Sequence, residues 1–191
     1  MQKLSRDFYL QDTIEVAKGA LGKIVVRRTN DGILSGRIVE TEAYLCNDPA
    51  CHAHRGMTKR NQVMFGEPGH AYVYFTYGMH FCLNFVAQPH GTAEAVLIRA
   101  LQPLGGIEIM RQNRYKHRDL DLCSGPGKLT QAMQIDSAMN GEDLLGDTLY
   151  VIDDGADVGE IIARPRIGLR VAVDKPWRFY PAAYKTWVSK Q

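Results

Sequence analysis

Two stretches of the 191-residue chain pair short apolar runs across a turn signal, and they restrict the fold more than any other feature. Residues 23–28 and 34–45 flank an Asn-Asp-Gly sequence at 30–32, which is typical of β-hairpin turns. Residues 70–86 repeat the pattern around Gly78. Because hairpins join neighbouring antiparallel strands, the sequence favours a largely antiparallel sheet.

The remaining patterns add helices and further strands. Asp12, with Glu15 three residues later, is a capping signal for a short amphipathic helix that closes at Gly22. Periodicity predicts helices near 104–114 and 126–134, and strands near 95–101, 148–153 and 160–172. The polar stretch from 46 to 69 is long for a structureless connection, which indicates a functional loop. The sequence therefore predicts an α+β fold in a single domain over residues 1–191.

Composition is that of a globular protein, with 45% apolar and 23% charged residues. No run of about 18 apolar residues occurs, so no membrane span is expected, and the first residues lack the apolar core of a signal peptide. We therefore expect a cytoplasmic protein with reduced cysteines. The net charge of +2 predicts no partner. Basic residues do cluster at 111–118 and near 164–178, either to contact anions or to form a solvated surface.

Alternation along strands gives the second hairpin two unlike faces, because successive side chains point to opposite sides. One face is apolar and suited to a core; it carries Ala71, Val73, Phe75, Phe81, Leu83 and Phe85. The other face is aromatic and polar; it carries His70, Tyr72, Tyr74, Thr76, His80, Cys82 and Asn84. Tyr77 precedes Gly78 near the tip, where a tyrosine is hard to pack against the rest of the protein.

The same rule puts charges inside two other apolar strands. Glu40, Glu42 and Tyr44 share one side of the strand ending at 45, and Arg99 lies in the strand 95–101. A guanidinium in such a place needs an acceptor, and a strand carboxylate is a natural one. The simplest arrangement is one cleft with a Glu–Arg pair at its floor, lined by Tyr44, Tyr72 or Tyr74, and Asn84. The alternative is a set of buried tyrosines with one stabilising ion pair.

Such a cleft suits a particular kind of chemistry. Aromatic walls stack flat π systems, and an asparagine can accept or reject a hydrogen-bonding edge. A carboxylate fixed by arginine can activate water or stabilise an oxocarbenium-like transition state. An aromatic side chain at a hairpin tip can wedge into a base stack. Together these features describe an enzyme that takes a nucleotide out of duplex DNA and hydrolyses its glycosidic bond.

At these residues the sequence resembles the alkyladenine (3-methyladenine, or methylpurine) DNA glycosylase family. The matching stretches span nearly the whole chain: 36–45 (GRIVETEAYL), the His52 region, Arg60 and Asn61, Met64 and Phe65, 70–84 (HAYVYFTYGMHFCLN), 96–101 (VLIRAL) and 122–132 (LCSGPGKLTQA). The resemblance implies a mostly antiparallel, curved sheet flanked by helices, with a hairpin that inserts into DNA. It also implies a monomer that acts on damaged purines in double-stranded DNA, without a cofactor or metal.

The resemblance assigns roles residue by residue. Glu42 matches the general base that activates the attacking water, and Arg99 matches the arginine that positions this water and the carboxylate. The flipped base is contacted by the residues that match Tyr44, His52 and Tyr74. Asn84 matches the residue that obstructs the 2-amino group of guanine. Tyr77 matches the side chain that fills the space left by the flipped nucleotide.

Two departures from the family pattern matter. The spacing from Tyr44 to His52 is one residue shorter than in the mammalian relatives. Gly127 stands where some members carry serine, so a phosphate contact from that hydroxyl is not carried over.

The resemblance also bears on the leaving group. Cationic bases such as 3-methyladenine leave as neutral groups and need little acid help, whereas hypoxanthine or ethenoadenine needs a proton donor, and we assign none. No lysine falls in the matched pocket strands, so a lyase step is not expected.

Several other interpretations stay open at this point. Cys46, Cys51, His52 and His54 could supply zinc ligands, although their spacing is not a common finger pattern. Residues 124–128 (SGPGK) lack the full Walker spacing and are better read as a helix start. Glu40 is either a second acid or an exposed strand residue, and we favour the exposed strand residue. Two other functions remain: a non-catalytic nucleic-acid binder on the same scaffold, and an enzyme acting on free nucleosides.

Overall fold

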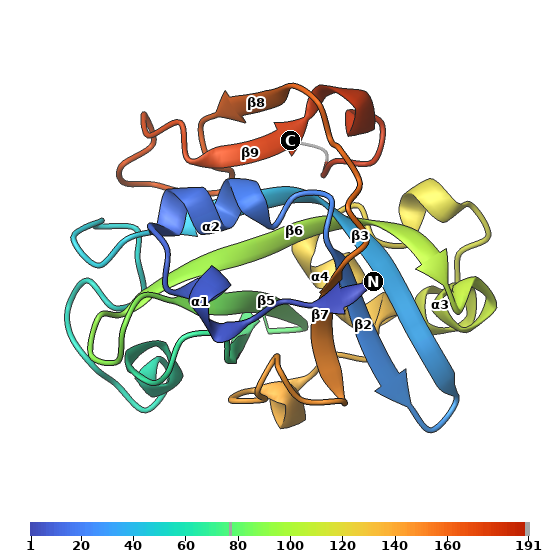
Figure 1. Ribbon diagram of the computed structural model, residues 1–191, viewed down its shortest axis with the longest axis horizontal. Helices are drawn as coiled ribbons and strands as arrows, with labels where there is room; N and C mark the ends of the chain where they lie inside the picture. The colour runs from blue at the N-terminus through green and yellow to red at the C-terminus, as the bar shows by residue number, and fades with distance from the viewer. Residues whose placement is uncertain (77, 190–191) are drawn as a thin grey trace.

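A single antiparallel sheet organises the protein, in agreement with the two hairpin patterns. The computed structural model describes residues 1–76 and 78–189, and within them nine strands pair in the order β1-β7-β2-β3-β6-β5-β4, with β9 on β3 and β8 on β9 (Figure 1). The strands are β1 (Gln2–Lys3), β2 (Ile24–Thr29), β3 (Gly32–Tyr44), β4 (Ala71–Thr76), β5 (His80–Ala87), β6 (Glu94–Gly105), β7 (Leu149–Asp153), β8 (Ile161–Arg164) and β9 (Arg178–Pro181). The predicted α+β class and the antiparallel sheet are confirmed.

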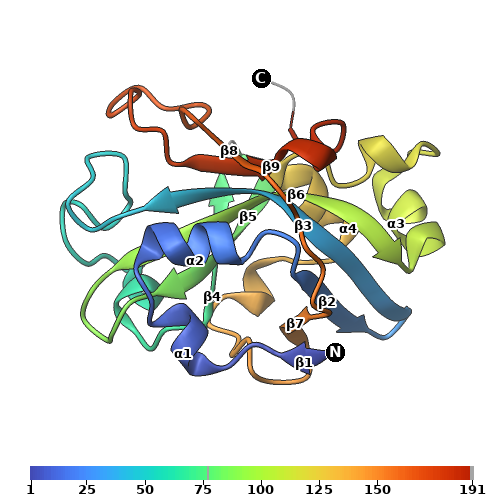
Figure 2. The same ribbon diagram turned by 45° about the horizontal axis from the view of Figure 1, so that its top comes forward.

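Helices cover both sides of the central strands. They are α1 (Arg6–Tyr9), α2 (Thr13–Gly19), α3 (Ile107–Arg114) and α4 (Pro126–Ala132), with short 3₁₀ turns η1 (Gln62–Phe65), η2 (Asp119–Asp121), η3 (Ser137–Met139) and η4 (Ala182–Tyr184). Helix α2 lies in front of β3 and β6, and α4 lies behind them (Figures 1 and 2). The predicted cap on α2 forms, because the Asp12 carboxylate accepts a hydrogen bond from the Ile14 amide at 2.9 Å.

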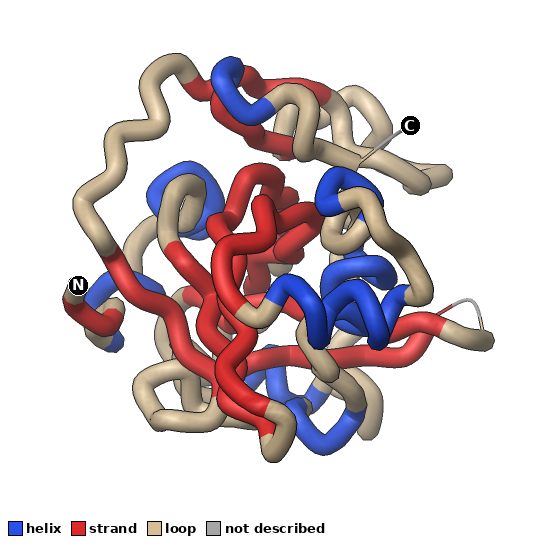
Figure 3. The backbone as a smooth tube through the Cα atoms, turned by 90° about the vertical axis from the view of Figure 1, so that its right-hand side faces the viewer, coloured by secondary structure: helices blue, strands red, loops and turns tan. Residues whose placement is uncertain are grey.

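The apolar residues that the structure describes form one main core and two smaller clusters, of which the one around Tyr72 lies at the hairpin. The main core contains the predicted inward face of the second hairpin, including Ala71, Val73, Leu83 and Phe85. The cluster around Tyr72 lies on the other face of the hairpin, with Tyr44 and Tyr74 packed against it. The hairpin of β4 and β5 extends outward from the rest of the molecule (Figure 3). There the predicted core position of Phe75 is wrong: its side chain contacts Phe81 but is half exposed.

The largest error in the predicted elements concerns the strand at 160–172. Strand β8 ends at Arg164, and residues 165–172 leave the sheet. Pro165 explains this, because proline has no amide hydrogen to donate to a strand ladder. The predicted helix at 104–114 begins only at Ile107, since β6 continues to Gly105 and Gly106 has a positive φ of 70°. Strand β9 had no clear signal in the sequence.

Candidate active site

One row of side chains crosses four strands and forms the base of the site. Glu42 pairs with Leu97 across β3 and β6, Leu97 with Asn84 across β6 and β5, and Asn84 with Tyr72 across β5 and β4. Directly opposite residues in a sheet lie on the same face as neighbours. The alternation rule therefore brings together the polar positions of strands separated by up to about 50 residues in the sequence.

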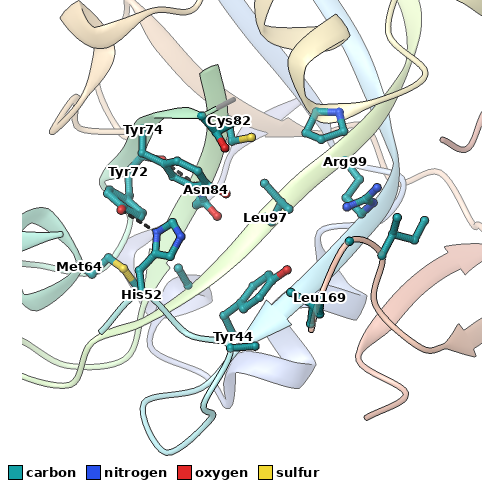
Figure 4. Close-up of a pocket in the computed structure, with 16 residues that line it drawn as sticks. Tyr44, His52, Met64, Tyr72, Tyr74, Cys82, Asn84, Leu97, Arg99 and Leu169 are labelled. Atoms are coloured by element: carbon teal, nitrogen blue, oxygen red, sulfur yellow. Dashed lines mark hydrogen bonds between the residues drawn. The ribbon is translucent and has the colours of Figure 1, made fainter. Parts of the chain in front are cut away.

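A cavity of about 220 Å³ lies over this row (Figure 4). It is lined by Tyr44, Ala50, His52, Met64, Tyr72, Tyr74, Thr76, Cys82, Asn84, Ala95, Leu97, Arg99, Pro126, Ile167, Gly168 and Leu169. Five of the seven residues singled out from the sequence therefore line one pocket. In Figure 4, His52 lies against Tyr72 and Tyr74, and Tyr44 and Arg99 reach the same space from other strands. Residues 167–169 were missed, because the sequence pattern placed them in a strand.

Glu42 lies next to this pocket and is completely buried. Its Oε1 is 3.2 Å from Nη1 of Arg99 and accepts a 2.8 Å hydrogen bond from the Ile167 amide. Its Oε2 accepts a 2.8 Å hydrogen bond from the Tyr44 hydroxyl. Burial raises the pKa of Glu42, while Arg99, the Ile167 amide and Tyr44 act in the opposite direction. All three hydrogen-bonding or ion-pair partners of the carboxylate line the pocket.

The tyrosine beside this carboxylate remains protonated. Burial raises the pKa of Tyr44 well above its usual value, and the neighbouring charge of Glu42 raises it further. A protonated phenol is the form that can donate to Glu42. Arg99 remains charged, since the two carboxylates near it outweigh the effect of burial and raise its pKa.

Histidine and two tyrosines form the opposite wall. The Nδ1 of His52 is 2.9 Å from the Tyr72 hydroxyl, and the His52 and Tyr74 rings meet edge to face at 4.5 Å between centroids. Enclosure by these rings lowers the pKa of His52 to about 4, and the guanidinium of Arg60 contributes. His52 is therefore a neutral group near pH 7. Asn84 donates from Nδ2 to the Tyr72 carbonyl at 3.0 Å, which fixes the direction of its amide.

The ring of Tyr44 is supported by a buried cation. The Arg166 guanidinium lies 4.6 Å from the centroid of the Tyr44 ring and 5.1 Å from that of Trp177. Arg166 is not among the residues that line the pocket, and it forms an ion pair with Asp48. Both of those side chains are without exposed surface. The Tyr44 side chain thus lines the pocket while the Arg166 guanidinium packs against its ring.

The prediction for Glu40 is wrong, because its side chain has no exposed surface. Strand β9 pairs with β3 and covers this position with Arg178, whose Nη1 is 3.0 Å from Oε1 of Glu40. The pairing of β3 with β6 is irregular between Ile38 and Thr41, opposite Arg99. Irregularities of this kind redirect side chains, and here Glu40 also comes within 3.4 Å of Nε of Arg99.

A family model described as methylpurine-DNA glycosylase matches residues 7–185. The chain belongs to the methylpurine-DNA glycosylase family. A protein of Carboxydothermus hydrogenoformans, named "Putative 3-methyladenine DNA glycosylase", is 53% identical over 98% of this chain and 99% of its own length. Proteins of the same printed name are 52% identical in Methanocella arvoryzae, over 94% of this chain and 92% of theirs, and 51% identical in Prosthecochloris aestuarii, over 94% and 88%.

The glycine at position 127, a departure from the glycosylase pattern, has a local physical reason. A Cβ atom added to Gly127 would lie 2.9 Å from Cγ of His80 and 3.0 Å from its Cβ. His80 thus occupies the space that a serine side chain would need. Tyr77, the hairpin-tip residue that the family resemblance assigns to DNA insertion, lies outside the described residues.

The cysteines of the alternative zinc site do not form a cluster of ligands in the part of the chain that the structure describes. Cys51 is buried and donates toward the Ala93 carbonyl, while Cys46 is exposed. Across residues 1–76 and 78–189, no cluster of three or more His, Cys, Asp or Glu side chains suits a metal ion. None of the helices within this part of the chain is both long and apolar enough to cross a bilayer.

The basic cluster at 111–118 is partly neutralised by acidic neighbours. Arg111 forms ion pairs with Glu108 and Asp119, and Arg118 forms one with Asp121. These pairs lie at the end of α3 and in the turn that follows it. They favour the interpretation of a solvated helix end over that of a phosphate-binding surface.

Proposed function

We propose that the chain is a base-excision-repair DNA glycosylase that hydrolyses the N-glycosidic bond of damaged purines and leaves an abasic site. The damaged purines are alkylated or deaminated ones, namely 3-methyladenine, 7-methylguanine, hypoxanthine and ethenoadenine. The base is flipped out of duplex DNA into the pocket, and Tyr77 fills the space that it leaves. The protein acts as a monomer, without a cofactor and without lyase activity.

The observation that carries this proposal is the buried Glu42–Arg99 pair beside an aromatic pocket. A carboxylate has about four lone-pair positions, and Glu42 uses three of them for Arg99, Ile167 and Tyr44. One position on Oε2 remains to accept a proton from a water molecule in the pocket. The charge of Arg99 favours the ionised form of the carboxylate. Because burial raises the pKa of Glu42, this carboxylate is a stronger base than that of an exposed glutamate.

The walls of the pocket suit a flat base. Tyr44 presents one face to the cavity and is backed by Arg166, while His52 and Tyr74 stand on the other side. Stacking of a base on aromatic side chains contributes about 1–3 kcal/mol per base. Asn84 has its Nδ2 engaged by a backbone carbonyl, which holds the amide at the purine edge, where it obstructs the 2-amino group of guanine. These roles follow the matches to the family residue by residue.

The surroundings also support simple hydrolysis. Among the described residues that line the pocket there is no lysine that could form a Schiff base with the sugar. The glycosidic bond breaks with an oxocarbenium-like transition state, which the Glu42 carboxylate stabilises while it takes the proton from water. A cationic base such as 3-methyladenine then departs as a neutral molecule.

The decisive experiment compares wild type with Glu42→Gln on duplex oligonucleotides that carry one defined lesion each. Abasic products are converted to strand breaks by alkali, and DNA binding is measured separately by fluorescence anisotropy. Removal of a general base should lower the single-turnover rate by about 10²–10⁴-fold, with binding to DNA largely unchanged. The control is Glu15→Gln, which neutralises a glutamate of α2 that forms an ion pair with Lys18 and, among the described residues, with no other cation.

Each competing function makes a different prediction in this experiment. A non-catalytic binder would bind the lesion duplex but release no base in either variant. An enzyme for free nucleosides would cleave the nucleoside and leave the duplex intact. Full activity of Glu42→Gln on every lesion would refute the assignment of the base.

A further inference from the structure

A second carboxylate network lies behind the Glu42–Arg99 pair. It contains Glu40, Arg178 and Ser189, and all three are buried. Ser189 is distant in sequence from β3, yet its backbone amide donates to Oε2 of Glu40 at 2.7 Å. None of these three residues is among the described residues that line the pocket. Arg99, which does line it, connects this network to Glu42.

We propose that Ser189 is a positioning residue for Arg99 and, through Arg99, for Glu42. The proposal rests on the function proposed above. The Ser189 hydroxyl accepts a 3.1 Å hydrogen bond from Nη2 of Arg99 and donates a 3.0 Å hydrogen bond to Oε1 of Glu40. A hydroxyl has one donor and two acceptor positions, so it can do both at once.

The contacts fix the plane of the Arg99 guanidinium from two sides. Its Nη1 faces Glu42 at 3.2 Å, its Nη2 faces Ser189, and its Nε lies 3.4 Å from both the Ser189 hydroxyl and Oε1 of Glu40. A guanidinium presents its donors in one rigid fork. Rotation that broke the Ser189 contact would therefore also move Nη1 relative to Glu42.

The C-terminal segment delivers Ser189 to this place. Strand β9 pairs with β3 at Thr41 and Glu42 (Figure 2), and after the turn η4 the Ser189 amide reaches Glu40. In β9 itself, Arg178 donates to Glu40 at 3.0 Å and to the Pro165 carbonyl at 2.9 Å. Glu40 is thus held by both ends of this segment, and Ser189 is the group that contacts Arg99 directly.

Loss of the Ser189 hydroxyl leaves a buried guanidinium nitrogen without its acceptor, while the amide contact to Glu40 remains. In Ser189→Ala, the single-turnover rate of base release should fall about tenfold, the size expected for one hydrogen bond to a charged group. The affinity for lesion DNA should stay within about twofold, because Ser189 does not line the pocket. Ser189→Thr, which retains the hydroxyl, should recover most of the rate.

Thr41→Val provides the matched control. Thr41 lies on β3 between the two glutamates, and its buried hydroxyl donates to the Ala17 carbonyl at 2.8 Å, away from Arg99. This variant should lower the melting temperature as Ser189→Ala does but leave the rate of base release unchanged. A positioning role also predicts that Ser189→Ala and Glu40→Gln are not additive, because both act on Arg99.

The outcomes separate this inference from the proposed function. If wild type excises a lesion, Glu42→Gln does not, and Ser189→Ala works within twofold of wild type, the positioning role is wrong and the function stands. Equal losses of rate in Ser189→Ala and Thr41→Val would also overturn the role, since stability alone would explain them. If wild type excises no lesion from any duplex, the proposed function itself fails.

Discussion

The ion pair of Asp48 and Arg166 offers a sharp test of how the pocket wall is built. Both side chains are fully buried, and Nη1 of Arg166 also donates to the Ala43 carbonyl at 2.9 Å. The guanidinium lies over the Tyr44 ring, and its Nε has no hydrogen-bond partner among the described residues. Because both side chains are inaccessible to solvent, water cannot readily replace a lost partner.

Asp48→Asn should lower the free energy of unfolding by about 3–5 kcal/mol, because Arg166 then stays buried without a counter-ion. The substitution keeps an oxygen for the 3.1 Å hydrogen bond from the Ala50 amide, so the local turn can persist. For a chain of this length, the loss corresponds to a fall in melting temperature of roughly 6–20 °C. Arg166→Met should cost a similar amount, since it leaves the Asp48 carboxylate unpaired.

The double variant distinguishes an ion pair from two independent contacts. If each single change mainly leaves the partner charge buried and unpaired, the double variant should be more stable than either single one, with a coupling energy of at least about 3 kcal/mol. Urea unfolding followed by tryptophan fluorescence measures this, because Trp177 lies against Arg166. Asp157→Asn is the control: that exposed aspartate makes the same kind of turn contact, to the Gly159 amide, without a cation. Additive losses, or a single-variant cost below about 1 kcal/mol, would refute the reasoning.

Three further predictions concern the site and the hairpin. In its proposed role as the base, Glu42 must be ionised, so the single-turnover rate should fall as pH drops through its raised pKa; Glu40→Gln should move the midpoint to lower pH, because the Glu40 charge raises the pKa of Glu42. The His52 ring should titrate near pH 4 by NMR, and a midpoint near its ordinary value would contradict the enclosure by Tyr72 and Tyr74. Gly127→Ser should lower the melting temperature in a thermal shift assay, and adding His80→Ala should recover it, because His80 fills the required space.

Alternation predicted the members of the site well, because a period of two assigns a side chain to a face without knowledge of the rest of the fold. Tyr44, Tyr74, Asn84 and Arg99 all line the pocket as expected. The predicted acceptor for Arg99 is also confirmed, since a guanidinium in an apolar strand requires a carboxylate and Glu42 lies within 3.2 Å. These inferences needed only local pattern and the cost of burying charge.

What covers a face could not be predicted in the same way. Glu40 was expected to be exposed, and it is buried where β9, about 140 residues later in the sequence, pairs with β3. The residues at 167–169 were assigned to a strand, whereas Pro165 ends the strand and leads the chain over the pocket. The first error comes from a contact between distant segments, which a local pattern does not contain, whereas the second comes from a proline that the sequence itself shows.

The four charges behind the pocket explain why this distant segment matters for the chemistry. Burial alone would drive Glu42 toward its neutral form, and Arg99 opposes that effect. Arg99 is shared with a second carboxylate, Glu40, so its full charge would not be available to Glu42 without Arg178, which pairs with Glu40 at 3.0 Å. The charges of two carboxylates thus balance those of two guanidiniums, and all four side chains are buried. In the proposed mechanism, a change at Arg178 of β9, which does not line the pocket, should act on Glu42 through Glu40 and Arg99 and should shift the pH dependence of the reaction before it changes the binding of DNA.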